Sequence, residues 1–453
     1  MMPAIPVAER LGESVMHSAA MTPQRLRPHY RIAILLAAIT TIIVLYRSLL
    51  QVESADVHWW FLPWLRHIHD HGIAQTLSIN LPVLVLEANN AGNYTPPYLY
   101  LLFLGSHAGP LADDLTVIKI VSISGAVFCA ASLYYLLSCY VRRDIAICGA
   151  IAYLLLPSVV LNAAAWGQIE SYYTGFILIA IARAEREDLL TCMAAFGIAI
   201  SIKLQAIFLG PFLLYLVISR KAPIGILIIP PIMYALMMLP AWIAGRPALD
   251  LAMIYVEQSH AYPWLSMNAP NPWTFVQYLR LVPQPAGMVL GILAGLVVGL
   301  LIAGLGFVRR DRGSDLLLVA LASVTLIPFV LPKMGDRYFF MADTLSYALA
   351  IAHTRRWSVG AAVAIQIGSF GAYLTHFSGV RIGTGLGVLS MTIAVAVICT
   401  QVFRLRQNRG RARDISAAPS ARSGNGTRSS AREASGRPSR PAPRREASRT
   451  GPP

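Results

Sequence analysis

Long apolar runs are the feature that most restricts what this 453-residue chain can fold into. They recur from Ile32 to Phe403, in a sequence that is 56% hydrophobic and 13% charged. Soluble domains do not have this composition, and a run of roughly 20 apolar residues is long enough to span a bilayer as a helix. Membrane-spanning strands would need alternating apolar and polar residues, a pattern that we do not find. We therefore expect an all-α polytopic membrane protein.

Clusters of basic residues between the apolar runs predict the topology. All of them can lie on the cytoplasmic side under a single assignment, in agreement with the positive-inside rule. The expected spans are 31–50, 116–140, 145–163, 171–183, 189–201, 204–219, 222–242, 286–308, 314–331, 338–353, 357–376 and 384–403. This gives a bundle of about 12 transmembrane helices, or about 11–13 depending on whether the run at 96–108 crosses, with both termini inside.

Composition predicts three regions. Residues 1–30 are expected to form a cytoplasmic N-terminal segment before a retained signal anchor, and residues 31–404 the transmembrane domain. From Arg404 to the end there are thirteen arginines, three acidic residues and no aromatic residue. Residues 405–453 should therefore be a disordered Arg-rich cytoplasmic tail that contacts anionic membrane lipid. Without aromatic residues to stack on bases, the tail argues against a nucleic-acid partner.

Asp56 is the most informative polar residue under this topology. It follows the first apolar run and precedes Trp59 and Trp60, so it is placed on the outer side near the lipid headgroups. The aromatic pattern from Asp56 to His71 has helical spacing and predicts an interfacial helix in the first outer loop. Asp56 is either a catalytic base facing a lipid-borne substrate or the N-cap of that helix.

Three further segments place polar residues at membrane depth on the same side. The segment 166–170 contains an amide and a carboxylate, which either contact substrate or form a hydrogen bond between helices. Lys203 separates two short apolar runs and either snorkels or binds an anion, and broken helices of this kind line cavities. In the segment 331–340, Asp336 and Arg337 form either a local ion pair or part of a phosphate site.

The first outer loop also contains a histidine cluster and ends in a polar sequence. His67 and His71 share one helix face but His69 does not, which favours a solvated polar face over a metal site. Asn93 and Tyr94 precede two prolines that lead into the next apolar run. We expect no cofactor, and a divalent metal ion stays an open alternative.

Together these residues suit the transfer of a sugar from a lipid phosphate. A carboxylate can remove the proton of an attacking hydroxyl, and cations can stabilise the charge that grows on a phosphate leaving group. Amides and aromatic rings suit sugar hydroxyls and C–H faces.

The motifs from residue 51 to about residue 350 resemble the polytopic GT-C glycosyltransferases. The nearest resemblance is to bacterial relatives of the mannosyltransferase that adds the second mannose to glycosylphosphatidylinositol. The chain departs from the family pattern at Gly335, which replaces His, at Asp336, which replaces Glu, and at Glu170, where Asp is common. The resemblance implies an inverting mechanism with Asp56 as general base.

The same resemblance implies the substrates and the residues that bind them. The donor would be a polyprenyl-phosphate sugar such as mannose, and the acceptor a glycolipid or glycan on the outer face of a bacterial inner membrane. Lys203 and Arg337 would bind the donor phosphate. The other substrate-binding candidates are Asn93, Tyr94, Trp166, Gln168, Glu170, Gln205, Asp336 and Tyr338.

Two alternatives remain open at this point. The first is a transporter or flippase of lipid-linked sugars. It is disfavoured because the spans show no internal repeat and the polar residues gather on one side rather than at the midplane. The second is a GT-C enzyme with another polyprenyl-phosphate sugar. Whichever sugar a glycosyltransferase of this kind transfers, the outer segment 245–285 is expected to shape the acceptor entrance.

Overall fold

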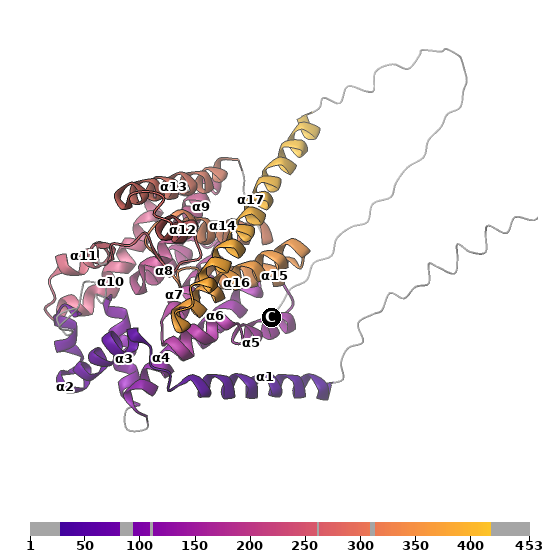
Figure 1. Ribbon diagram of the computed structural model, residues 1–453. Helices are drawn as coiled ribbons and strands as arrows, with labels where there is room; N and C mark the ends of the chain where they lie inside the picture. Colours follow the sequence, from indigo (N-terminus) through magenta and orange to yellow (C-terminus); the bar gives the residue numbers. More distant parts are fainter. Residues whose placement is uncertain (1–27, 82–93, 109–111, 261, 309–312, 418–453) are drawn as a thin grey trace, which may run out of the picture. The chain divides into compact units, whose positions relative to one another are not determined.

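The computed structural model of the protein describes residues 28–81, 94–108, 112–260, 262–308 and 313–417. These residues form α-helices joined by short irregular segments (Figure 1), which confirms the all-α fold class. The helices of the first half are α1 (Pro28–Leu49), α2 (Leu62–Ser78), α3 (Pro96–Ser106), α4 (Asp114–Leu137), α5 (Arg143–Tyr153), α6 (Pro157–Val160), α7 (Glu170–Glu185), α8 (Leu189–Ile202) and α9 (Gly210–Ser219). Those of the second half are α10 (Ile229–Ile243), α11 (Ala248–His260), α12 (Pro272–Tyr278), α13 (Gln284–Gly304), α14 (Ser314–Val330), α15 (Phe340–His353), α16 (Arg356–Ser378) and α17 (Ile382–Ala417).

Short helical turns of other types extend or interrupt these helices. The π turns are η1 (Val57–Phe61) and η4 (Leu161–Trp166). The 3-10 turns are η5 (Leu204–Leu209), η6 (Ile224–Ile228) and η7 (Leu305–Phe307).

Within the described ranges, five helices are long and apolar enough to cross a bilayer, or six if one bent pair counts as a single span. They cover Asp114–Leu137, Ile224–Ile243, Gln284–Phe307, Arg356–Ser378 and Ile382–Arg404, and the bent pair is Arg143–Tyr153 with Pro157–Trp166. This fits an all-α membrane protein. Breaks within the apolar runs leave pieces such as the 14-residue α8, so twelve crossings stay a prediction.

Helix α7 lies in the middle of the packed helices. It contacts α4 on one side and α8 on another, and α8 in turn packs against α10. Glycines let α4 and α7 approach closely: a Cβ atom on Gly175 would lie 2.5 Å from the Phe128 ring, and one on Gly125 would lie 2.7 Å from the Tyr172 ring. Small residues allow this kind of close helix packing in membrane proteins. The N-terminus of α7, at Glu170, is therefore held in the protein interior.

Two breaks in the helices place backbone groups and polar side chains in the interior of the bundle. The π turn η4 ends at Gly167, whose φ of 78° is a left-handed conformation that favours glycine. Helix α8 ends at Lys203, which is extended with φ −156° and ψ 137° before η5 begins. The second break lies where the sequence places two short apolar runs end to end.

The segment after Asp56 is helical and buries an aromatic face. Phe61 and Trp64 pack against Tyr94 and Tyr98, with ring centroids 4.9 Å apart for Phe61 and Tyr98 and 5.4 Å apart for Trp64 and Tyr94. Trp59, by contrast, is 50% exposed. The position of this helix along a membrane surface stays a prediction.

The segment 245–285, which the sequence predicts to lie on the outer side, pairs with the segment that carries Arg337. Strand β1 (Ser266–Met267) pairs in parallel with β2 (Met334–Gly335). The amide of Lys333 also donates to the carbonyl of Leu265 at 2.7 Å. This pairing holds α11 and α12 in the same part of the protein as Arg337.

Helices α16 and α17 approach each other through glycines. A Cβ atom on Gly387 would lie 2.7 Å from the carbonyl oxygen of Gly368. At the end of α16, the Thr375 hydroxyl accepts the amide of Thr384 at 2.9 Å. The last turn of α16 is thus fixed by α17.

The chain divides into two compact units, Met1–Arg406 and Gln407–Pro453. Helix α17 continues to Ala417, so residues 405–417 are helical although composition predicts disorder for them. Glutamine, arginine and alanine are good helix formers, and here they extend a helix that the apolar run has already started. The other predictions for the termini concern residues 1–27 and 418–453, which lie outside the described residues.

Candidate functional site

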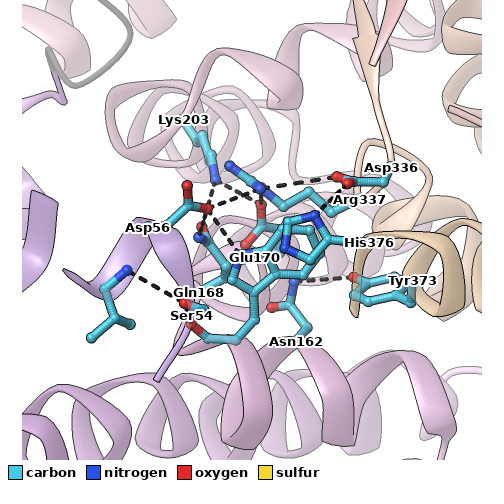
Figure 2. Close-up of polar contacts among 12 residues, drawn as sticks. Ser54, Asp56, Asn162, Gln168, Glu170, Lys203, Asp336, Arg337, Tyr373 and His376 are labelled. Atoms are coloured by element: carbon cyan, nitrogen blue, oxygen red, sulfur yellow. Dashed lines mark hydrogen bonds and ion pairs between the residues drawn. The ribbon is translucent and has the colours of Figure 1, made fainter. Parts of the chain in front are cut away.

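Asp56 belongs to a cluster of polar side chains drawn from distant parts of the sequence (Figure 2). Its Oδ2 atom accepts hydrogen bonds from Trp166 Nε1 at 2.9 Å and Gln168 Nε2 at 2.5 Å, and lies 3.1 Å from Arg337 NH1. Asp56 stands at the N-cap position of the π turn η1, but its side chain makes no capping hydrogen bond there. All three contacts within the described residues use Oδ2, which leaves Oδ1 available to a ligand.

The loop that supplies Trp166 and Gln168 is held by backbone contacts. Ser54 donates to the carbonyl of Trp166 at 2.8 Å, and the buried Lys119 ammonium donates to the carbonyl of Ala165 at 2.5 Å. A Cβ atom on Gly167 would meet Val57 Cγ2 at 3.0 Å. The loop therefore packs directly on the turn that carries Asp56, and this fixes both donors to its carboxylate.

Glu170 and Lys203 form a buried ion pair next to Asp56. Lys203 Nζ lies 2.6 Å from Glu170 Oε1 and 3.4 Å from Gln168 Oε1. The side chains are 9% and 1% exposed for Lys203 and Glu170, so the lysine does not snorkel to the surface. The break between α8 and η5 aims it inward instead.

Arg337 joins the two carboxylates. Its NH1 lies 3.1 Å from Asp56 Oδ2 and its Nε lies 3.1 Å from Glu170 Oε1. The Nε contact is an ion pair without hydrogen-bond geometry. The guanidinium carbon also lies 4.7 Å from the centre of the Trp166 ring. By comparison, the neighbouring Asp336 is 4.0 Å away, so the predicted local pair is the weakest of these contacts.

His376 completes the cluster and was not among the predicted residues. Its Nδ1 lies 3.0 Å from Asp336 Oδ2, and its ring stacks on Trp166 with centroids 3.6 Å apart. Below them, Asn162 donates to the Tyr373 hydroxyl at 3.1 Å. The predicted topology would put the end of the expected span 357–376 on the outer side, but a single histidine there carries no local motif that would connect it to Asp336.

Three of the other predicted residues, Tyr94, Gln205 and Tyr338, lie beside the Asp56 cluster. Tyr94 is buried, and its ring lies 5.3 Å from Lys203 Nζ. Gln205 and Tyr338 line the pocket beside Asp56. Asn93 lies outside the described residues. The structure therefore brings Asp56, Lys203 and Arg337 together in one place, while their roles stay proposals.

Two adjoining cavities open beside this cluster. The first is polar, has a volume of about 80 Å³, and is lined by residues that include Asp56, Lys203 and Arg337. The second is largely apolar and has a volume of about 470 Å³. The residues common to both linings are Gln205, Gln258, Tyr262 and Tyr338. A ligand with a polar head and an apolar chain fits this division.

The pKa values of the two cations shift in opposite directions. Burial lowers the pKa of Lys203, and the nearby Glu170 carboxylate opposes this effect. Burial would also lower the pKa of Arg337, but the carboxylates of Asp56 and Glu170 outweigh it and raise that pKa well above its ordinary value. Arg337 is a permanent cation, whereas Lys203 can lose its charge at alkaline pH.

In the described part of the chain, no group of three or more His, Cys, Asp or Glu side chains could hold a metal ion. The rings of His67 and His71 stack with centroids 4.3 Å apart.

No protein-family model matches the sequence, and no curated protein sequence matches it either. The function is therefore inferred from the chemistry of the Asp56 cluster.

Proposed function

We propose that this protein is an inverting glycosyltransferase that uses a polyprenyl-phosphate sugar. The sugar, mannose by the family resemblance, would be transferred to a hydroxyl of a lipid or glycan acceptor at the outer face of a bacterial inner membrane. One observation carries the proposal. Asp56 contacts Arg337 at 3.1 Å in a polar pocket that also contains Lys203 and adjoins an apolar cavity.

Asp56 is the proposed general base. Hydrogen bonds from Trp166 and Gln168 hold Oδ2, so Oδ1 can accept the proton of an acceptor hydroxyl. The hydroxyl oxygen then forms a bond to the anomeric carbon while the bond from that carbon to the phosphate oxygen breaks. The electron pair of the broken bond stays on the phosphate, and the proton stays on Asp56. Attack from the side opposite the phosphate inverts the anomeric configuration.

Lys203 and Arg337 are the proposed partners of the leaving phosphate. Without substrate they are paired with Glu170 and Asp56. A guanidinium has five N–H donors, so Arg337 can contact a phosphate oxygen while it still contacts a carboxylate. Attraction to these cations strengthens as charge develops on the phosphate, which lowers the barrier to transfer.

The apolar cavity is the proposed place for the carrier chain next to the phosphate. Its walls include Ile207, Met288, Ile292 and Leu331. The polar pocket of about 80 Å³ is smaller than the sites that enclose whole small molecules, which are about 300–1,000 Å³. The sugar would therefore occupy the polar pocket together with the adjoining part of the larger cavity.

The outer segment 245–285 supplies the wall expected to face the acceptor. Tyr255, Gln258 and Tyr262 from this segment line the polar pocket together with Asp56. The position of these residues supports the acceptor entrance predicted for this segment.

The direct test is transfer by the purified protein in lipid nanodiscs. Polyprenyl phosphates that carry mannose, glucose or a pentose are supplied with a lipid extract as acceptor, and products are identified by mass spectrometry. We expect the acceptor mass to increase by one sugar, mannose in preference to the others, with inverted configuration by NMR. Absence of transfer with all donors, together with movement of intact donor across proteoliposomes, would instead establish a flippase.

A further inference from the structure

We propose that His376 is a positioning residue that keeps Asp336 away from Arg337 and so leaves the guanidinium available to Asp56 and the donor phosphate. The proposal about the phosphate rests on the proposed function, whereas the link between His376 and Asp336 does not.

The fold fixes the position of His376. It lies in the last turn of α16, which ends at Gly379 with a φ of 71°. The adjacent Thr375 is held by α17 through the Thr384 amide. The His376 side chain is 27% exposed, and the Asp336 side chain is 11% exposed. The backbone that carries His376 is therefore fixed beside Asp336.

The balance of charge around Arg337 explains why His376 matters. Three carboxylates lie near this guanidinium: Asp56 at 3.1 Å, Glu170 at 3.1 Å and Asp336 at 4.0 Å. Asp336 is the one held elsewhere, because its Oδ2 lies 3.0 Å from His376 Nδ1. Without the imidazole beside it, the nearly buried Asp336 carboxylate would move closer to the guanidinium of Arg337, which already lies 4.0 Å away. It would then compete with Asp56 and oppose the binding of a phosphate.

A second contact acts through Trp166. The His376 ring stacks on the indole at 3.6 Å between centroids, with 25° between the planes. The same indole donates to Asp56 Oδ2 at 2.9 Å. His376 therefore reaches the proposed base by two routes, a polar contact of its Nδ1 with the Asp336 carboxylate and a ring contact to Trp166.

Two substitutions separate these routes. His376→Phe keeps a ring against Trp166 but removes the polar nitrogen beside Asp336. His376→Asn keeps a polar group close to the position of Nδ1 but removes the ring. If the contact with Asp336 matters more than the ring contact with Trp166, His376→Phe lowers the transfer rate by about tenfold and raises the KM for the donor. His376→Asn then lowers the rate by less.

The decisive variant is the double substitution His376→Phe with Asp336→Asn. Because the amide introduced by Asp336→Asn carries no charge to compete for Arg337, the double variant should recover transfer to within about threefold of Asp336→Asn alone. The proposal would be overturned if the rate of the double variant fell by the product of the factors for His376→Phe and Asp336→Asn. An unchanged rate in His376→Phe alone would also overturn it. His107→Phe is a control, since His107 is exposed at the end of α3 and lies outside the cluster.

Thermal unfolding in detergent provides a readout that needs no substrate. It is measured for the wild-type protein, for His376→Phe, for Asp336→Asn and for the double variant. His376→Phe should lower the unfolding midpoint more in the wild-type background than in the Asp336→Asn background. Equal shifts in both backgrounds would show that the pair is not coupled and would overturn the proposal. If the wild-type protein transfers no sugar, the proposed function fails while this unfolding comparison still decides whether His376 and Asp336 are linked.

Discussion

The guanidinium of Arg337 lies 3.1 Å from the carboxylate of Asp56, which joins the segment before α15 to the turn that follows α1. The same guanidinium lies 3.1 Å from Glu170. One side chain thus connects a proposed base to a buried ion pair. The geometry of the planar guanidinium makes this possible, because it offers donors in several directions.

Arg337→Lys should therefore impair transfer although it keeps the positive charge. A single ammonium cannot reproduce the two contacts to Asp56 and Glu170, so the orientation of Asp56 and the phosphate contact both weaken. We expect kcat/KM for the donor to fall by about tenfold or more. Steady-state kinetics in nanodiscs measure this, with Arg142→Lys as a control because the Arg142 ion pair is exposed. Equal loss in the two variants would contradict the role of Arg337.

Lys203 should set the alkaline limit of transfer. Burial lowers its pKa, so its charge is lost below the pH at which an ordinary lysine, with a pKa of about 10.4, would lose it. Transfer should fall as the pH rises through this lowered pKa, because the neutral amine no longer attracts the phosphate. Lys203→Arg should move the fall to higher pH, and an unchanged profile would contradict this assignment.

A rise in pH should change the stability of the folded protein in the opposite direction to the transfer rate. Between the lowered pKa of Lys203 in the folded protein and its ordinary pKa in the unfolded chain, unfolding takes up a proton. The free energy of unfolding should therefore rise with pH in this window as far as Lys203 contributes. A loss of transfer there without a fall in the unfolding midpoint separates the loss of charge from denaturation.

Gly167→Ala should damage the site more than the same change at Gly72. Both glycines have a φ of 78°, but an added Cβ meets Val57 at 3.0 Å at Gly167 and no atom within 4 Å at Gly72. Each substitution should cost about 1–3 kcal/mol through backbone strain. Only Gly167→Ala should also displace the donors to Asp56 and lower transfer. Similar transfer rates in the two variants, measured after correction for folded protein, would contradict this account of the loop.

Met288→Trp should weaken the binding of donors with long carrier chains. Met288 lines the apolar cavity of about 470 Å³, and an indole there would occupy part of it. We expect KM to rise by about tenfold for a long-chain donor and much less for a donor with a short chain. Val289→Trp is a matched control, because Val289 is 57% exposed on the same helix. If both donors respond equally to Met288→Trp, the carrier chain lies elsewhere.

The sequence predicts the polar residues of the site better than it predicts their arrangement. Asp56, Lys203 and Arg337 can be identified because charged residues near or within membrane spans require a partner or a function. The direct contact between Asp56 and Arg337 depends on the turn at Gly167 and on the pairing of β1 with β2. Such contacts between distant segments leave no local pattern in one sequence.

The lengths of the helices and the position of His376 also could not be predicted from the sequence. Apolar runs predict where helices occur, but the π turn η4 and the 3-10 turn η5 divide them at positions that hydropathy does not indicate. His376 is one polar residue at the end of an apolar run. Only the packing of α16 against α17 and the approach of Asp336 give it a place in the cluster.

The most direct test of the central claim is the transfer rate of Asp56→Asn compared with Asp70→Asn. Asp70 is an exposed carboxylate on α2 and lies outside the cluster, so its loss controls for removal of a negative charge from the same segment. If Asp56 is the general base, Asp56→Asn lowers kcat by about 10²–10⁴-fold with donor binding retained, and Asp70→Asn leaves it within about twofold. A rate for folded Asp56→Asn within about threefold of wild type would contradict the account.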